Sequence, residues 1–121
     1  MSLKISGLTK KFGEQIALND INITIANNEI IGLLGPNGAG KSTLMKSITS
    51  VLKIEEGEIL LDEKNISDNE IESKKKIGFL PENNPLYNEM FVKEYLQFVA
   101  NLHHIKKERV EQVIDLVGIT P

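Results

Sequence analysis

The stretch EIIGLLGPNGAGKST, residues 29–43, decides the fold class of this chain. It opens with a continuous apolar run, Glu29–Leu34, which is typical of a strand buried on both faces of a parallel sheet. A glycine-rich segment follows at once. Beyond it, apolar residues recur at helical spacing between Lys41 and Leu52, so we expect a helix there. The order of strand, glycine-rich loop and helix predicts an α/β fold.

Residues 35–42, GPNGAGKS, match the pattern GxxxxGK[ST] of the Walker A phosphate loop. Glycines let the backbone bend around a phosphate, and their N–H groups can then converge on its oxygens. The helix that follows points its positive end at the same anion. Chance would produce this pattern in a chain of 121 residues less than about once in a hundred. We therefore expect a nucleotide to bind at the loop residues Gly35, Pro36, Asn37, Gly38, Ala39 and Gly40.

Three side chains at the end of this motif carry the predicted chemistry. Lys41 would reach the β- and γ-phosphate oxygens, and it is the predicted catalytic residue. Ser42 Oγ is placed to bind Mg²⁺, a hard cation that prefers oxygen ligands. Thr43 would donate to the α-phosphate. The predicted cofactors are thus ATP and Mg²⁺.

The composition excludes several other kinds of site. The chain has no cysteine, which excludes a disulfide framework, a thiolate nucleophile and a cysteine-ligated metal. Its net charge of −3 argues against a general electrostatic grip on nucleic acid. No apolar run in the sequence approaches the length of a membrane span. Acidic residues crowd positions 55–72, and we interpret them as a solvated face.

Periodicity predicts further elements on both sides of the loop. Alternating or continuous apolar residues predict strands. Apolar residues at helical spacing predict two helices, and the second of them ends before Gly118. The expected strands are Leu3–Leu8, Ala17–Ile25, Glu58–Asp62 and Ile77–Leu80, and the expected helices are Phe91–His103 and Lys106–Val117.

Asp62 and Glu63 imitate a Walker B pair, because they follow the apolar residues Ile59, Leu60 and Leu61. In a phosphate-loop ATPase, such an aspartate orders the magnesium shell and the glutamate polarises water. The pair comes only a few residues after the loop helix and a glycine turn, however. We therefore interpret it as the end of a surface strand.

The sequence GPNGAGKST after EIIGLLG resembles the nucleotide-binding subunits of ABC transporters. Leu8–Gly13 (LTKKFG) resembles the A-loop segment of that family, and the resemblance implies that Phe12 stacks on adenine. Ile77–Glu82 (IGFLPE) resembles the stretch that leads into the Q-loop. The family usually has Gln where this chain has Glu82, and the resemblance implies that Glu82 joins Ser42 as a magnesium ligand.

This resemblance implies an α/β P-loop NTPase with a RecA-like core, the small antiparallel β-subdomain of the family and the start of its helical subdomain. It also implies a truncated domain, of which the chain covers the first half. In that scheme, residues 1–34 and 55–64 give the antiparallel strands and the strand before the loop. Residues 35–52 give the loop and helix, 77–90 a strand and the Q-loop region, and 91–121 the start of the helical subdomain. Central strands would come from outside the chain, so we expect open apolar edges and either self-association or marginal stability.

The implied function is that of an ATP-binding subunit that couples ATP hydrolysis to transport by a membrane permease. The segment LPENNPLY, residues 80–87, looks most like the branch paired with ABC-2-type permeases, including gliding-motility and sodium- or drug-exporter types. A second ATP-binding subunit is the other expected partner. We expect no nucleic-acid partner, no direct membrane insertion, and a place on the cytoplasmic face of the cell membrane through the permease.

The sequence leaves three alternatives to this function. The chain lacks an LSGGQ-like signature, so these residues taken alone are expected to bind nucleotide without efficient hydrolysis. A soluble ABC-type ATPase that works on DNA or ribosomes would have a similar loop, but basic arms are absent. A small P-loop kinase needs an arginine-rich lid, whereas Arg109 is the single arginine of this chain.

Overall fold

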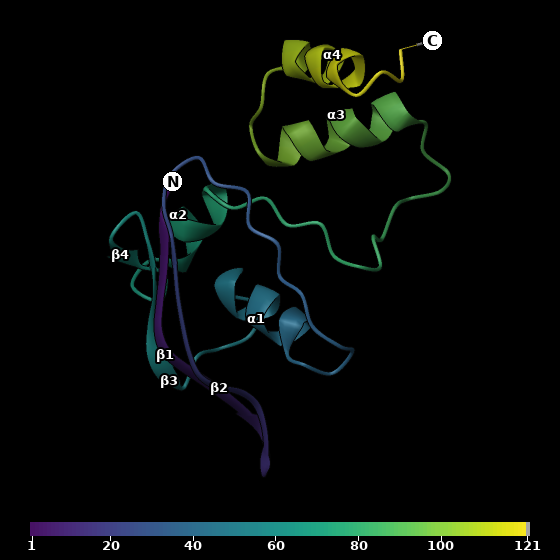
Figure 1. Ribbon diagram of the computed structural model, residues 1–121. Helices are drawn as coiled ribbons and strands as arrows, with labels where there is room; N and C mark the ends of the chain where they lie inside the picture. The colour runs from purple at the N-terminus through teal and green to yellow at the C-terminus, as the bar shows by residue number, and fades with distance from the viewer. Residues whose placement is uncertain (121) are drawn as a thin grey trace. The chain divides into compact units, whose positions relative to one another are not determined.

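The computed structural model describes residues 1–120. These residues form two compact units, of which the first ends at Leu80 and the second begins at Pro81. The first unit contains all the strands and two helices, and the second unit contains two helices (Figure 1). In chain order the elements are β1 (Leu3–Phe12), β2 (Gln15–Ile25), α1 (Lys41–Ile48), β3 (Glu56–Leu61), β4 (Lys64–Asn65), α2 (Glu70–Lys75), α3 (Val92–Leu102) and α4 (Lys107–Leu116). Pro121, the last residue of the predicted 91–121 segment, lies outside the described residues.

The sheet of the first unit is antiparallel, with the strand order β2-β1-β3-β4. A two-residue turn joins β1 to β2, and Gly13 supplies its left-handed φ of 62°. A second two-residue turn joins β3 to β4 at Asp62 and Glu63, both with positive φ, as a type I′ hairpin requires. Asp62 and Glu63 are therefore the turn that ends a strand, and our interpretation of this pair is confirmed.

The core of the first unit lies between the sheet and α1, which runs along one side of the strands (Figure 1). Leu44 of α1 packs there against apolar side chains of the sheet and of the segment after β4. Fully burying one such side chain stabilises the fold by about 1.5–3 kcal/mol. The buried members of this cluster are Ile5, Leu8, Leu18, Leu44, Ile59, Leu61 and Ile66.

Two glycines, Gly7 on β1 and Gly57 on β3, lie close together. The register between these strands shifts between Ser6 and Thr9, and Gly57 faces Gly7 at this point. A Cβ on Gly57 would lie 2.5 Å from the carbonyl oxygen of Gly7, and the φ of Gly57 is 88°. Only glycine fits this position without a displacement of the backbone.

Two predicted strands are absent from the described residues. Glu29–Leu34 and Ile77–Leu80 form no strand, and Ile30 and Leu34 are almost fully exposed. A strand is stabilised by ladder hydrogen bonds to a neighbour, and the sheet of residues 1–120 contains no parallel strand that could pair with either segment. Both segments are apolar in sequence, but the prediction that they form strands is wrong for this structure.

The helix predicted over residues 41–52 ends earlier than expected. α1 stops at Ile48, and Ser50 takes a left-handed φ of 57°. The N–H groups of Val51 and Leu52 then both donate to the carbonyl of Lys46, at 2.8 and 3.0 Å. This arrangement satisfies the last carbonyls of the helix, as helix ends commonly do.

The second unit is a helical hairpin. Ala100, Val110 and Ile114 are buried between α3 and α4, and the side chain of Glu94 accepts a hydrogen bond from the Phe91 N–H that precedes α3, at 2.9 Å. Gly118 follows α4 with a φ of 72°, so the predicted stop at this glycine is confirmed. Within the described part of the chain, no helix is both long enough and apolar enough to span a membrane.

Candidate phosphate-binding site

The predicted loop folds into a tight turn in front of α1. The N–H of Ala39 donates to the carbonyl of Pro36 at 3.2 Å, and Gly38 and Gly40 have φ values of 84° and 94°. A Cβ added to Gly35 would lie 3.3 Å from the Cβ of Ala39, so the two ends of the turn lie close together. The loop is therefore a tight turn whose backbone uses the positive φ that glycine permits.

The helix that leaves the loop has no side-chain cap. Gly40 is its N-cap residue, and the first helical hydrogen bond runs from the Leu44 N–H to the Gly40 carbonyl at 2.8 Å. In most helices a Ser, Thr, Asp or Asn side chain occupies the N-terminal N–H groups. Here the first turn keeps those donors and its partial positive charge available to an anion.

Lys41 brings a full positive charge to the same place. Its Nζ donates to the carbonyl oxygens of Gly35 and Pro36, the second at 3.1 Å. The ammonium group thus lies beside the loop backbone and is oriented by it. Ser42 is exposed and Thr43 half-buried, both in the first turn of α1.

The end of the loop is held against the sheet. A Cβ on Gly40 would lie 2.6 Å from the carbonyl oxygen of Ala17 and 3.0 Å from Cδ2 of Leu18, both on β2. Leu18 pairs with Lys10 on β1, and Phe12 lies two residues further along β1, on the same face as Lys10. Strand spacings place Phe12 within roughly 10 Å of the segment that Gly40 contacts. The structure therefore brings Phe12 to the loop side of the sheet, where it is 49% exposed.

Two residues beside this site, Leu18 and Lys10, could not be identified from the sequence pattern. Leu18 is one of several alternating strand residues, and nothing in that alternation shows that it packs on Gly40. Lys10 is one of a pair of lysines before Phe12, yet its Nζ lies 5.4 Å from the centre of the Phe12 ring. Only the strand register and the turn of the loop bring these residues to the site.

Glu82 is the remaining predicted site residue. It is exposed and belongs to the second unit, whereas the loop belongs to the first. Among the residues that the structure describes, no group of three or more His, Cys, Asp or Glu side chains could hold a metal ion. A magnesium role for Glu82 therefore stays a prediction.

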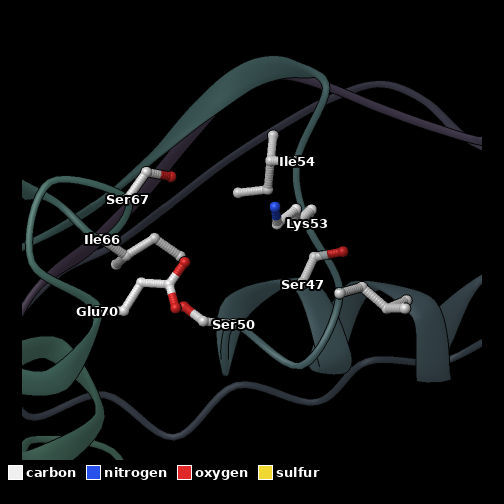
Figure 2. A pocket seen from close by; sticks show the side chains of 8 residues that line it. Ser47, Ser50, Lys53, Ile54, Ile66, Ser67 and Glu70 are labelled. Carbon is white, nitrogen blue, oxygen red and sulfur yellow. The ribbon is translucent and has the colours of Figure 1, made fainter.

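A cavity lies at the C-terminal end of α1. Its volume is about 220 Å³, and it is lined by Ser47 of α1, by residues of the segments that follow α1 and β4, and by Glu70 at the start of α2 (Figure 2). Sites for small molecules usually measure about 300–1,000 Å³. The hydroxyl of Ser47, one of its lining residues, already donates to the Thr43 carbonyl at 2.8 Å. This cavity is too small for a nucleotide and offers no phosphate cradle.

The loop residues fit a magnesium-bound nucleoside triphosphate. The glycine backbone, the uncapped helix end and the Lys41 ammonium group all favour a polyanion at one place. The Ser42 hydroxyl is a hard oxygen donor in the adjoining first turn, which is the ligand type that Mg²⁺ prefers.

Sequence comparisons agree with this geometry. A family model described as "ABC transporter" matches residues 18–121. The chain is 39% identical over 123 residues to the sulfate/thiosulfate import ATP-binding protein CysA of Mesostigma viride, covering 98% of the chain and 35% of that protein. It is 31% identical over 117 residues to the lantibiotic transport ATP-binding protein SrtF of Streptococcus pyogenes, covering 97% and 50%. The chain thus spans half or less of the length of these relatives.

The fold also matches a solved structure. A putative ABC transporter ATP-binding protein from Pyrococcus furiosus superposes with a TM-score of 0.82 at 31% identity, over 100% of this chain and 59% of that one. The likeness covers both the α/β arrangement and the sequence, including the part that carries the phosphate loop. The chain belongs to the ABC transporter family, as part of an ATP-binding domain with the P-loop NTPase fold.

Proposed function

We propose that this chain binds Mg-ATP at residues 35–43 and that the protein it belongs to uses the bound ATP to drive a membrane transporter. The observation that carries this proposal is the uncapped N-terminus of α1 beside the Lys41 ammonium group, at the end of a glycine turn. Fixed N–H dipoles and one cation at a single backbone turn are suited to a triphosphate.

Each residue of the motif has a distinct role in this proposal. The backbone of residues 35–40 surrounds the β-phosphate, and Lys41 exchanges its loop carbonyls for β- and γ-phosphate oxygens. Thr43 donates to the α-phosphate, and Ser42 holds Mg²⁺. The cation neutralises charge on the terminal phosphates when it is bound. Phe12 stacks on adenine.

The remaining parts of the proposal rest on the family. Glu82 is proposed as the second protein ligand of Mg²⁺, through a carboxylate oxygen. The proposed partners are a second ATP-binding subunit and a permease of the ABC-2 type, at the cytoplasmic face of the membrane. The relatives reported above include both an import protein and a lantibiotic transport protein, so the direction of transport is not part of the proposal.

Binding of Mg-ATP tests the core of the proposal. We expect Lys41→Ala to weaken equilibrium binding by about tenfold to a hundredfold, because a hydrogen bond to a charged group contributes about 1.5–3 kcal/mol. Lys46→Ala is the matched control, since Lys46 lies in the last turn of the same helix. Isothermal titration measures both variants. Equal affinity of the wild type and Lys41→Ala would refute the proposed site.

Hydrolysis separates two versions of this function. We expect the 121 residues to release little phosphate from ATP, because hydrolysis needs a positioned water and the chain has no signature segment. A phosphate-release assay on the wild type and Lys41→Ala measures this. Turnover that Lys41→Ala abolishes would show that these residues hydrolyse ATP by themselves. An ABC-type ATPase that is not linked to transport is the alternative function, and a nucleic-acid dependence of turnover would favour it.

A further inference from the structure

Lys10 is a buried lysine that the proposed site does not yet use. It is only 7% exposed, and among residues 1–120 it is the one charged residue that is buried. Its Nζ lies 2.5 Å from Oε1 of Glu55 and 3.0 Å from the carbonyl oxygen of Lys53. A buried ammonium group is costly unless it is paired and hydrogen-bonded, and these two partners meet that requirement. Lys10 is therefore held in one position by the segment between α1 and β3.

The same ammonium group lies over an aromatic ring. Its Nζ is 5.4 Å from the centroid of Phe12, two residues further along β1 and on the same face. A cation within about 6 Å of a ring centroid is attracted by the negative face of the ring. Phe12 nevertheless stays 49% exposed, so much of the ring surface is open to another flat group.

This pair lies on the side of the sheet that faces the phosphate loop. Lys10 pairs across the strands with Leu18, and Leu18 is the side chain against which Gly40 packs. A base linked to phosphates at the loop would approach the ring from this side. The orientation of the ring then decides how well the base stacks.

We propose that Lys10 is a positioning residue that fixes the Phe12 ring for stacking on the base of the nucleotide, and that Glu55 in turn fixes Lys10. The inference rests on the proposed function, in which Phe12 stacks on adenine. A half-exposed ring that is already oriented loses less conformational freedom on binding. The expected contribution to nucleotide affinity is about two- to fivefold, the usual range for a partly exposed cation–π contact.

Two probes separate positioning from a direct charge effect. The first is Mg-ATP, which carries a base, and the second is inorganic triphosphate with Mg²⁺, which carries none. We expect Lys10→Met to weaken binding of Mg-ATP by about two- to fivefold and to leave binding of triphosphate unchanged. A methionine fills the buried space, and the Glu55 carboxylate that loses its partner is 56% exposed to water, so the variant is expected to fold. If triphosphate binding falls by the same factor, Lys10 acts on the phosphates and the inference is overturned.

Lys11→Met is the matched control. Lys11 is the next residue on the strand and also faces a glutamate, since its Nζ is 3.6 Å from Oε1 of Glu56, but it is exposed. This variant removes the same charge and should not change the affinity for either probe. Glu55→Gln keeps the lysine and weakens only its anchor. It should lower Mg-ATP affinity in the same direction as Lys10→Met but less, and an unchanged affinity would contradict the role of Glu55.

A double-mutant cycle with Phe12→Leu distinguishes the two possible failures. If Phe12→Leu leaves Mg-ATP affinity unchanged, the stacking role of Phe12 fails, and the inference fails with it. If Phe12→Leu weakens Mg-ATP binding but Lys10→Met does not, only the inference fails. If both weaken it and Lys10→Met has no further effect in the Phe12→Leu background, the inference is supported, because the effect of Lys10 passes through the ring.

Discussion

Gly40 has two independent constraints at the residue scale. Its φ of 94° is a left-handed value that residues other than glycine adopt only at a cost in energy. Its missing Cβ also leaves the space in which the carbonyl of Ala17 lies, 2.6 Å from the position such an atom would take. Gly38 shares the first constraint, with a φ of 84°, but a Cβ there would meet nothing within 4 Å. The backbone angle therefore requires glycine at both positions, but the lack of space for a Cβ requires it only at Gly40.

We predict that Gly40→Ala reduces Mg-ATP affinity much more than Gly38→Ala. The alanine at position 40 would push the start of α1 away from β2 and displace the loop. The alanine at position 38 would add only backbone strain, about 1–2 kcal/mol. Titration of Mg-ATP into both variants, with thermal unfolding as a check on folding, measures the difference. Equal losses would show that backbone strain alone governs the loop.

At the element scale, the contact between β1 and β3 depends on the glycine pair Gly7 and Gly57. We predict that Gly57→Ala destabilises the first unit by more than about 2 kcal/mol, because both the φ of 88° and the carbonyl of Gly7 oppose a Cβ. Gly13→Ala is the control. Gly13 also has a left-handed φ, 62°, but lies at an open hairpin turn where a Cβ meets nothing within 4 Å. Denaturant unfolding of the two variants should rank them in this order.

The turn between β3 and β4 also forms a hydrogen bond with the N-terminal segment. Oδ1 of Asp62 accepts a hydrogen bond from the Ser2 N–H at 2.8 Å, and Oδ2 lies 3.5 Å from Nζ of Lys76. The Ser2 hydrogen bond is the main cause that holds the pKa of Asp62 below its ordinary value, with smaller contributions from the N-terminal charge and Lys76. The carboxylate is thus more favourable in the folded chain than in the unfolded one.

This lowered pKa predicts a dependence of stability on pH. A depressed pKa stabilises the fold above the unfolded-state pKa, and the stabilisation disappears as the pH falls through the folded-state pKa. Asp62→Asn should therefore be less stable than the wild type near pH 7, and the difference should shrink as the pH falls below 3.8, the ordinary pKa of an aspartate. Asparagine tolerates the φ of 49° at this position, so the backbone strain is similar.

Lys76→Met tests the order of the causes. It removes the ion pair but leaves the Ser2 hydrogen bond, so it should reproduce only a part of the Asp62→Asn effect. Thermal unfolding at several pH values measures all three proteins. A constant difference between wild type and Asp62→Asn across the acid range would contradict the assignment.

At the scale of the whole molecule, the apolar segment before the loop lacks a partner in residues 1–120. Ile30 and Leu34 are almost fully exposed. Unpaired backbone next to apolar side chains pairs readily with another chain. The exposure of this segment is the physical basis for the expected self-association.

We predict that the purified chain sediments above its monomer mass of 13.5 kDa at micromolar concentrations. The double change Ile30→Ser and Leu34→Ser should shift it toward the monomer. Ile71→Ser is the control, because Ile71 is also exposed but lies in α2, whose backbone groups bond within the helix. Sedimentation velocity across a dilution series measures this. A wild type that stays monomeric and unfolds cooperatively would contradict the prediction.

The sequence by itself predicted the glycine-rich loop before a helix, the end of a strand at Asp62 and Glu63, strands within β1 and β2, and the stop at Gly118. These features depend on neighbours along the chain: a φ that only glycine reaches easily, an alternation of period two, or a helix stripe. The family followed from the same local patterns, because the phosphate loop uses backbone geometry that one short motif encodes.

Only the tertiary structure decided which residues share a site. The contact of Gly40 with Ala17 and the placement of Lys10 over Phe12 come from strand register, which a local pattern leaves open. The strand predicted at Glu29–Leu34 failed for the same physical reason. An apolar run indicates that a segment prefers to be buried, but a strand forms only where another strand supplies its hydrogen bonds.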